Sequence, residues 1–228
     1  MLKSTPRTVT DKLYTVYACT LVILFFLSII IEKGNDVLFI NGNYSSASDE
    51  FFRSITHLGD GLVFIPIVIL ALFIRFEYAL MCAALTLGNG LLVSIFKRLL
   101  FPGMLRPKNV LDNEILHFVP GVDVHGVHSF PSGHTTTAFC IALFLTLITR
   151  NQVVGLVTLV IALLVGYSRI YLLQHFLVDV AAGAVIGCFT TYMVWQLFKN
   201  ANKPQWMSAH LSINIKLNRP EPQKEKVA

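Results

Sequence analysis

The residues best suited to chemistry lie in three short polar groups at the ends of long apolar runs. In one group, His175 and Asp179 are four residues apart at the start of such a run, so a helix would place both on one face. A carboxylate beside an imidazole fixes the ring tautomer and leaves one ring nitrogen free to attack. A structural pair that joins two helices has the same spacing. Ionisable groups beside apolar runs favour the chemical interpretation, because their burial is costly unless they have a function.

A second group, Pro131-Ser132-Gly133-His134, leads directly into another apolar run. A Ser-Gly turn that opens a helix presents free backbone N–H groups and the positive end of the helix dipole. Such a terminus binds anions, phosphate above all. His134 would then lie in the first helical turn, beside the bound anion. The alternative is that Ser132 is only an N-cap and His134 a solvated residue at the end of the helix.

The third group consists of cations at the ends of apolar runs, namely Lys97, Arg106 and Arg169. An arginine can bind phosphate oxygens through two parallel hydrogen bonds. Fixed cations could therefore stabilise the charge that develops on a transferred phosphoryl group without a metal ion. For Arg98, next to Lys97, we favour a side chain that only reaches from a helix end toward water.

Apolar helices must position these groups. The chain has 228 residues, of which 54% are hydrophobic and 14% charged, and its mean hydropathy is +0.65. Its net charge of +5 is spread between apolar runs and forms no basic patch, which argues against a nucleic-acid partner. Six runs could span a bilayer: residues 13–31, 61–74, 76–100, 135–149, 152–173 and 176–198. We predict an all-α membrane bundle of six transmembrane helices.

The distribution of lysine and arginine predicts the orientation of the bundle. It places both termini in the cytoplasm and the three polar groups on the outer face, close to the headgroups. Two outer segments are long, residues 32–60 and the polar loop 101–133. In the first, Phe51, Phe52 and Ile55 follow helical spacing, and Ser46 with Asp49 resembles a capping box. This segment is either an amphipathic helix on the membrane surface or a packed loop helix.

The composition also predicts where the membrane domain ends. Residues 1–200 form the six-span domain, and residues 201–228 form a polar, proline-containing cytoplasmic tail that is expected to be partly disordered. The four cysteines each fall inside an apolar run, so we expect buried packing residues rather than disulfides or a zinc site.

Together, the three groups resemble the signature of the type 2 phosphatidic acid phosphatase superfamily, which includes lipid phosphate phosphatases and vanadium haloperoxidases. The family pattern is a lysine followed by Arg-Pro, then Pro-Ser-Gly-His, then Ser-Arg with a histidine six residues after the arginine and an aspartate four residues later. The second part is complete at residues 131–134, and the third is complete at Ser168, Arg169, His175 and Asp179. The resemblance covers residues 13–198.

The first part of the pattern departs from the family. Six residues usually separate the lysine from the Arg-Pro pair, whereas eight separate Lys97 from Arg106 here, and seven separate Arg98 from it. Pro102-Gly103 could loop out the extra residues. The sequence therefore leaves open whether Lys97 or Arg98 fills the first cationic position.

The resemblance implies a role for each matched residue. Phosphate would be held by Lys97, Arg106, Arg169, the Ser132 side chain and the Gly133 backbone. His175 would attack phosphorus and form a phosphohistidine, and Asp179 would orient it. His134 would protonate the leaving alcohol and then activate water. No cofactor and no metal ion are implied.

The implied substrate is a phosphomonoester or pyrophosphate of a membrane lipid, reached from the outer face. The short loops and compact size favour a bacterial inner membrane, whose outer face is periplasmic. Phosphatidic acid, phosphatidylglycerophosphate, undecaprenyl pyrophosphate and a lipid A phosphate would all suit the motifs, and the oligomeric state is open. A non-enzymatic lipid-phosphate binder or transporter on the same fold is the alternative. His117, His125 and His128 share the polar outer loop, where headgroup recognition is favoured over a metal site.

Overall fold

A computed structural model describes residues 7–212, with side chains from residue 11 onward, and this part of the chain is all-helical. The eight α-helices are α1 (Arg7–Ile30), α2 (Asn35–Gly42), α3 (Ser46–Ile55), α4 (Phe64–Leu72), α5 (Phe76–Ile95), α6 (Gly133–Thr149), α7 (Gln152–Tyr171) and α8 (Leu177–Asn200). A π-helical turn, Phe96–Leu100, extends α5. Short 3₁₀ turns occupy Thr56–Gly59, Gly61–Val63, Pro107–Asn109, Asn113–Ile115 and Gln205–Ser208.

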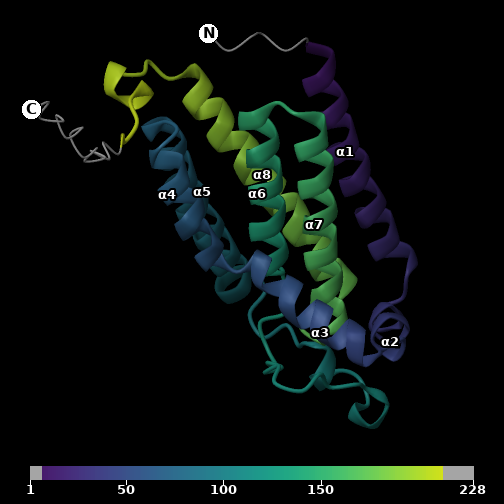
Figure 1. The fold of residues 1–228 in the computed structure, drawn as a ribbon. Coiled ribbons are helices and arrows are strands. Elements are labelled where there is room, and N and C mark those ends of the chain that lie inside the picture. The colour runs from purple at the N-terminus through teal and green to yellow at the C-terminus, as the bar shows by residue number, and fades with distance from the viewer. Residues whose placement is uncertain (1–6, 213–228) are drawn as a thin grey trace, which may run out of the picture.

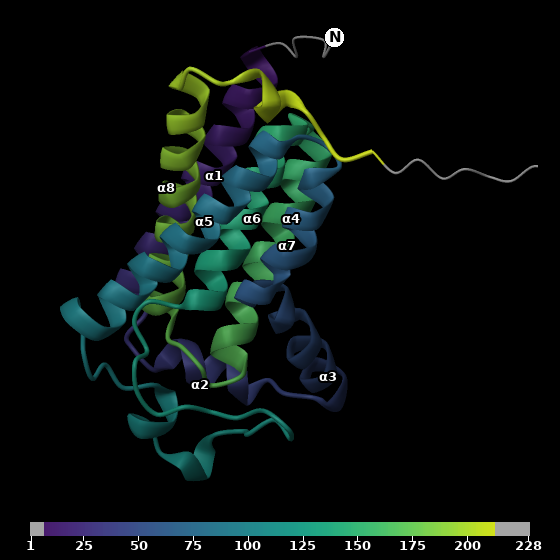
Figure 2. The ribbon, with the colours of Figure 1, turned by 90° about the vertical axis from the view of Figure 1, so that its left-hand side faces the viewer.

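Helix α6 lies at the centre of the bundle and packs along both α7 and α8. Helix α1 covers α7 and α8 from one side, and the α4–α5 pair lies against α6 and α8 from another (Figures 1 and 2). The short helices α2 and α3 gather with the loop 101–132 at one end of the bundle. The ends of α1 and α8 near the two termini lie at the opposite end (Figure 1).

The start of each central helix has a local chemical cause. The Ser132 side chain caps α6 by accepting from the Thr135 N–H at 3.4 Å, and Asn151 caps α7 by accepting from two backbone N–H groups at 2.8 and 3.2 Å. The Asp179 carboxylate accepts from the Phe176 N–H at 2.9 Å, at the start of α8. These bonds satisfy N–H groups that have no partner inside a helix.

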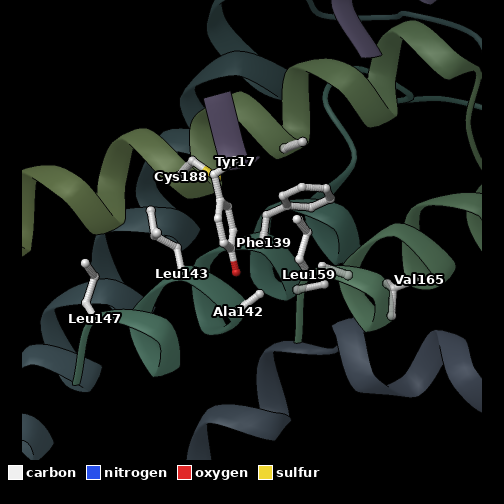
Figure 3. Packing of buried hydrophobic residues seen from close by; sticks show 11 residues of the cluster. Tyr17, Phe139, Ala142, Leu143, Leu147, Leu159, Val165 and Cys188 are labelled. Carbon is white, nitrogen blue, oxygen red and sulfur yellow. The ribbon is translucent and has the colours of Figure 1, made fainter. Parts of the chain in front are cut away.

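The main core cluster joins α1, α6, α7 and α8 (Figure 3). Phe139 and Leu143 of α6 pack there with Leu159 of α7, and the Tyr17 ring enters from α1 with its hydroxyl 3.1 Å from Thr146 Oγ1. On the outer side of the bundle, by contrast, many large apolar side chains are exposed, as expected where lipid replaces water. Three cysteines are buried as predicted, but Cys19 is exposed, because it faces away from the bundle.

Four helices are long and apolar enough to cross a membrane: α1, the α5 unit through Leu100, α7 and α8. Helix α6 is apolar but has only 17 residues. The predicted span 61–74 is short, and its helix qualifies only together with the segment Ser46–Gly59, from which it is bent by 60°. The described chain is therefore an all-helical, multi-pass membrane protein, and the count of six spans stays a prediction.

The segment before this bend forms a helix, as predicted, but its cap differs. Ser45, rather than Ser46, is the N-cap of α3 and accepts from the Ser48 N–H at 3.1 Å. Asp49 does not cap the helix, because its carboxylate instead accepts from the Tyr171 hydroxyl at 2.5 Å. The Phe52 ring lies 4.6 Å from the Tyr171 ring, centre to centre, which favours the packed-helix interpretation for this face.

The first residues after α8 fold back on the α4–α5 turn. The Phe76 N–H donates to the Ala209 carbonyl and the Leu211 N–H to the Leu72 carbonyl, both at 2.9 Å, and Lys203 forms a 2.6 Å ion pair with Glu77. The beginning of the predicted tail is thus attached to the bundle. Residues 213–228, on which most of the predicted disorder falls, lie outside the described residues.

Close packing of α8 on α6 predicts a large effect of Gly187→Ala. A Cβ at this position would lie 2.3 Å from the Thr136 carbonyl oxygen, so the two helices would have to separate. We expect a loss of about 1–3 kcal/mol in stability, which is typical of overpacking. Thermal unfolding in detergent measures it.

Gly90→Ala is the matched control, because a Cβ added at Gly90 would have no neighbouring atom within 4 Å. It should leave the melting temperature unchanged or raise it slightly. Equal melting temperatures for the two alanine variants would contradict the proposed close contact.

Candidate active site

A cavity of about 420 Å³ opens at the end of the bundle that carries α3 and the loop 101–132. Six of the eight site residues predicted from the sequence line it: Lys97, Arg106, Gly133, His134, Arg169 and His175. The other two, Ser132 and Asp179, are buried, with exposed fractions of 0% and 1%. The fold thus brings together residues that are up to 78 positions apart in the chain, from Lys97 to His175.

His175 reaches the cavity from the turn between α7 and α8. The N–H groups of Gln174 and His175 both donate to the Arg169 carbonyl, at 2.9 and 3.1 Å, so the chain folds back on the end of α7. The sequence analysis placed His175 and Asp179 on one helical face, but α8 begins only at Leu177. Their pairing is therefore made by the turn rather than by helical periodicity alone.

The Asp179 carboxylate holds several groups with a single oxygen. Its Oδ2 accepts from the Ser129 hydroxyl at 2.5 Å and from the Phe176 N–H at 2.9 Å, and it lies 3.4 Å from His175 Nδ1. That last contact is short but does not have the geometry of a full hydrogen bond, and Nδ1 has no other partner among the described residues. Asp179 is thus positioned to hold the imidazole from behind the cavity.

The Pro-Ser-Gly-His motif leads directly into α6, with His134 in the first turn, as predicted. The Ser132 oxygen accepts from the Thr135 N–H and, at 2.9 Å, from the Thr135 hydroxyl, so Ser132 is an N-cap and does not itself line the cavity. Gly133 and His134 do line it. The Ser132 N–H donates to the Asp179 carbonyl at 3.0 Å, which joins this turn to α8.

Two arginines line the cavity and are themselves held by neutral groups. Arg169 donates to the Thr56 hydroxyl at 2.7 Å, and its buried Nε has no partner among the described residues. Arg106 donates to the Val127 carbonyl at 3.1 Å and to the Gln174 side-chain oxygen. Neither guanidinium is in an ion pair with a described carboxylate. Their charge therefore remains available to an anion.

The structure brings Lys97, and not Arg98, to the cavity. The π-helical turn Phe96–Leu100 widens the end of α5, and the chain then turns at Gly103, whose φ is +81°. These two features accommodate the longer spacing before Arg106, and the second is the loop that the sequence suggested at Pro102-Gly103.

Several lining residues were missed in the sequence. Thr56, His57 and Asp60 follow α3 and belong to none of the three polar groups, so their only signal was a polar stretch after an amphipathic helix. Gly59 allows this stretch to approach α6, since a Cβ there would lie 2.7 Å from the His134 carbonyl oxygen. Gln174, Asp123 and Ser129 were missed too, because only the folded loop brings them to the site.

The three loop histidines do not gather. His125 lines the cavity, whereas His117 bonds Asp49 at 2.9 Å and stacks on Tyr44, and His128 lies 3.3 Å from the Lys97 carbonyl. In the described part of the chain, no three His, Cys, Asp or Glu side chains cluster in a way that could hold a metal ion.

Burial determines the protonation state of His175. Its removal from solvent lowers its pKa to about 3, although the nearby Asp179 carboxylate acts in the opposite direction. Arg169 and Arg106 lower the pKa further. The imidazole is therefore neutral near pH 7 and carries a lone pair on one ring nitrogen.

This lowered pKa predicts a pH dependence of stability. Between the ordinary value of 6.5 and the folded value of about 3, the unfolded chain binds a proton at His175 that the folded protein does not, so stability falls as the pH drops through this window. The fully developed slope for one proton is about 1.4 kcal/mol per pH unit. His175→Gln should make the melting temperature less sensitive to pH between 7.5 and 4.5.

His210→Gln, which removes an exposed histidine after α8, is the matched control and should keep the wild-type pH dependence. The same slope in wild type and His175→Gln would show that this imidazole is not held neutral by the fold.

The chain is similar to known proteins in sequence. The model of the PAP2 superfamily matches residues 77–203. A lipid A 4′-phosphatase of Porphyromonas gingivalis is 34% identical over 37% of this chain, although the match spans only 35% of that protein. Phosphatidylglycerophosphatase B of Bacillus subtilis is 33% identical over 64% of this chain and 73% of its own length.

Two solved structures have the same fold. The crystal structure of Aquifex aeolicus LpxE superposes with a TM-score of 0.63 at 28% identity, over 70% of this chain and 92% of that one. The crystal structure of a PAP2-type phosphatidylglycerolphosphate phosphatase from Bacillus subtilis superposes with a TM-score of 0.61 at 25% identity, over 82% of this chain and 98% of that one. Because the family model covers more than half of the chain, including all three polar groups, this protein belongs to the PAP2 superfamily.

Proposed function

We propose that this chain is an integral membrane phosphatase that hydrolyses a phosphomonoester or pyrophosphate of a membrane lipid through a phosphohistidine intermediate. The observation that carries the proposal is the meeting of a neutral histidine, three cations and a helix N-terminus around one cavity. Relatives that are named lipid A phosphatase, phosphatidylglycerophosphatase and undecaprenyl-diphosphatase support the lipid class of the substrate.

The phosphate is held by charge and by the start of α6. Lys97, Arg106 and Arg169 surround it, and the Gly133 N–H donates from the first helical turn. Ser132 is buried and accepts from the Thr135 N–H and hydroxyl, so in this proposal it supports the site by capping α6 next to the Gly133 N–H. Charge on the equatorial oxygens increases as the phosphoryl group is transferred, and these fixed donors stabilise it there.

His175 is the nucleophile. With its proton on Nδ1, facing Asp179 Oδ2 at 3.4 Å, the Nε2 lone pair attacks phosphorus and the bond to the lipid oxygen breaks. The negative charge of the bound phosphate favours the imidazolium form of His134, which then gives the leaving oxygen a proton. It then accepts a proton from water, whose oxygen attacks the phosphohistidine and releases inorganic phosphate. No step needs a cofactor or a metal ion.

The cavity faces the periplasmic side of the inner membrane in this proposal. Six crossings, by α1, the bent segment that ends in α4, α5, α6, α7 and α8, keep both termini in the cytoplasm, where lysine and arginine are more abundant. Helix α6, with 17 residues, is at the lower limit of a spanning length. Bacterial relatives support the assignment to a bacterial membrane.

His175→Ala should abolish phosphate release. The nucleophile is removed, so we expect a fall in kcat of at least about 10⁴-fold, as for other nucleophile deletions. The assay is phosphate release in detergent with EDTA, from phosphatidic acid, phosphatidylglycerophosphate, undecaprenyl pyrophosphate and a lipid A phosphate. In the wild type, an alkali-stable, acid-labile phosphate should be trapped on His175.

His210→Ala, far from the cavity, controls for the loss of a histidine and should keep full activity. Wild-type-like release from folded His175→Ala would refute the nucleophile. Folded wild-type protein that binds the lipid phosphates but releases none would favour the alternative, a binder or transporter.

The two neighbouring cations at the end of α5 provide a second test. Lys97 lines the cavity and Arg98 does not, so Lys97→Ala should lower kcat/KM by about 10–100-fold, the value of one or two charge-assisted hydrogen bonds. Arg98→Ala should stay within about twofold of wild type. The reverse ranking, measured on the best substrate of the panel, would assign the first cationic position to Arg98.

A further inference from the structure

The end of the bundle opposite the catalytic cavity contains a second cavity, of about 490 Å³. Its walls come from the start of α1, the α4–α5 turn, the α6–α7 turn and the end of α8, which lie together near the termini (Figures 1 and 2). The proposed phosphatase mechanism uses none of its residues.

Cations outnumber acids in this cavity. Arg75, Arg150, Lys199 and Lys203 line it, against Asp11 and Glu77. Lys203 is in a 2.6 Å ion pair with the buried Glu77, which fastens the segment after α8 to α5. The other three cations have no ion-pair partner in the part of the chain that the structure describes. The cavity therefore presents unneutralised positive charge in a concave site.

Aromatic side chains form the rest of the wall. Tyr14, Tyr78, Trp195 and Phe198 line the cavity, and the buried Met81 and Leu147 form its apolar floor. Tyrosine and tryptophan are the residues that favour the boundary between headgroups and acyl chains. Leu197, next to this wall on α8, is 71% exposed, as a lipid-facing side chain would be. The site thus combines a cationic rim with an apolar floor and lipid-facing surroundings.

The backbone conformation of Arg150 is a second observation, independent of the charge, that favours a function for this cavity. Arg150 follows α6 with φ 50° and ψ 31°, in the left-handed region where glycine or asparagine is normal. An arginine there is strained, and strain held in a fold often marks a function. The Arg150 charge also stabilises the negative, C-terminal end of the α6 dipole, which is a purely structural role. An experiment must therefore separate the effect of the charge from the effect of the backbone strain.

We propose that this cavity binds the phosphate-bearing headgroup of an anionic phospholipid from the leaflet opposite the catalytic cavity. The cations bind the phosphate, the aromatic rings surround the glycerol region, and the acyl chains lie along the apolar surface of α8. Basic pockets between transmembrane helices recognise anionic headgroups in this way. The site goes beyond the proposed phosphatase activity and does not depend on it.

Binding is tested on the full-length protein in detergent with phosphatidylglycerol, whose phosphate is a diester, with phosphatidylcholine as the zwitterionic comparison. Native mass spectrometry counts bound lipid, and thermal unfolding measures the stabilisation it gives. Arg75→Gln/Arg150→Gln should weaken phosphatidylglycerol binding by more than about tenfold, since one cation near a membrane surface contributes about fivefold. Arg106→Gln, in the catalytic cavity, should leave this binding unchanged.

Lys12→Gln is the matched control. Lys12 is an exposed cation at the start of α1, at the same end of the bundle, and it does not line the cavity. It should bind phosphatidylglycerol as the wild type does. Three results would overturn the proposal: equal affinity for phosphatidylcholine, an equal loss in Lys12→Gln, or inorganic phosphate that stabilises the protein as much as phosphatidylglycerol.

Arg150→Gly separates charge from strain. Glycine adopts the left-handed conformation freely, so the variant without added lipid should melt at or above the wild-type temperature, while its affinity for phosphatidylglycerol should fall about fivefold. A purely structural arginine would give the opposite pattern, with a lower melting temperature and unchanged lipid binding.

Discussion

The hydrogen bonds of Asp179 connect the parts of the site to one another. Its carboxylate oxygen holds the Ser129 hydroxyl of the loop 101–132 and the Phe176 N–H at the start of α8, and lies beside His175. Its backbone carbonyl accepts from the Ser132 N–H, directly before α6. Burying a carboxylate is costly unless it is paired and hydrogen-bonded, and these contacts offset that cost for Asp179. They also fix the distance between the histidine in the turn and the start of α6, where we propose that the phosphate binds.

Close helix packing makes this arrangement possible. A Cβ at Gly183 would lie 2.6 Å from the Ser132 carbonyl oxygen, and Gly59 approaches His134 just as closely on the other side. Small residues therefore allow α8 and the turn after α3 to contact the first turn of α6 from two sides. The cations around the cavity repel one another and lose hydration, a cost that the packed bundle offsets. The proposed phosphate would therefore meet cations that are already in place, which is how electrostatic catalysis avoids reorganisation.

The two ends of the bundle use cations differently. At the catalytic end, the arginines are held rigidly by neutral partners such as Thr56 and Gln174, and a neutral imidazole lies among them. At the opposite end, the cations line a cavity with an aromatic wall and no described histidine. Preorganised charge with a nucleophile suits chemistry on a phosphate. Charge beside aromatic and apolar surface suits the retention of a headgroup whose chains remain in the bilayer.

The sequence by itself determined that the chain forms apolar helices and which short polar motifs stand at the ends of those helices. Long apolar runs can satisfy their backbone in a membrane only as helices, and the fixed spacing in Pro131–His134 and in Arg169–His175–Asp179 carried the family and the core of the site. Contacts between distant segments were decided only by the tertiary structure, because they depend on how loops fold rather than on local spacing. Ser129 behind Asp179, Thr56 on Arg169, and the choice of Lys97 over Arg98 are of this kind. The cap at Ser45 was not predicted, because Asp49 accepts a hydrogen bond from Tyr171, a distant residue, instead of capping α3. The bend before α4 was not predicted either, because the apolar segment on its own is too short to show that the helix breaks at Gly59–Gly61.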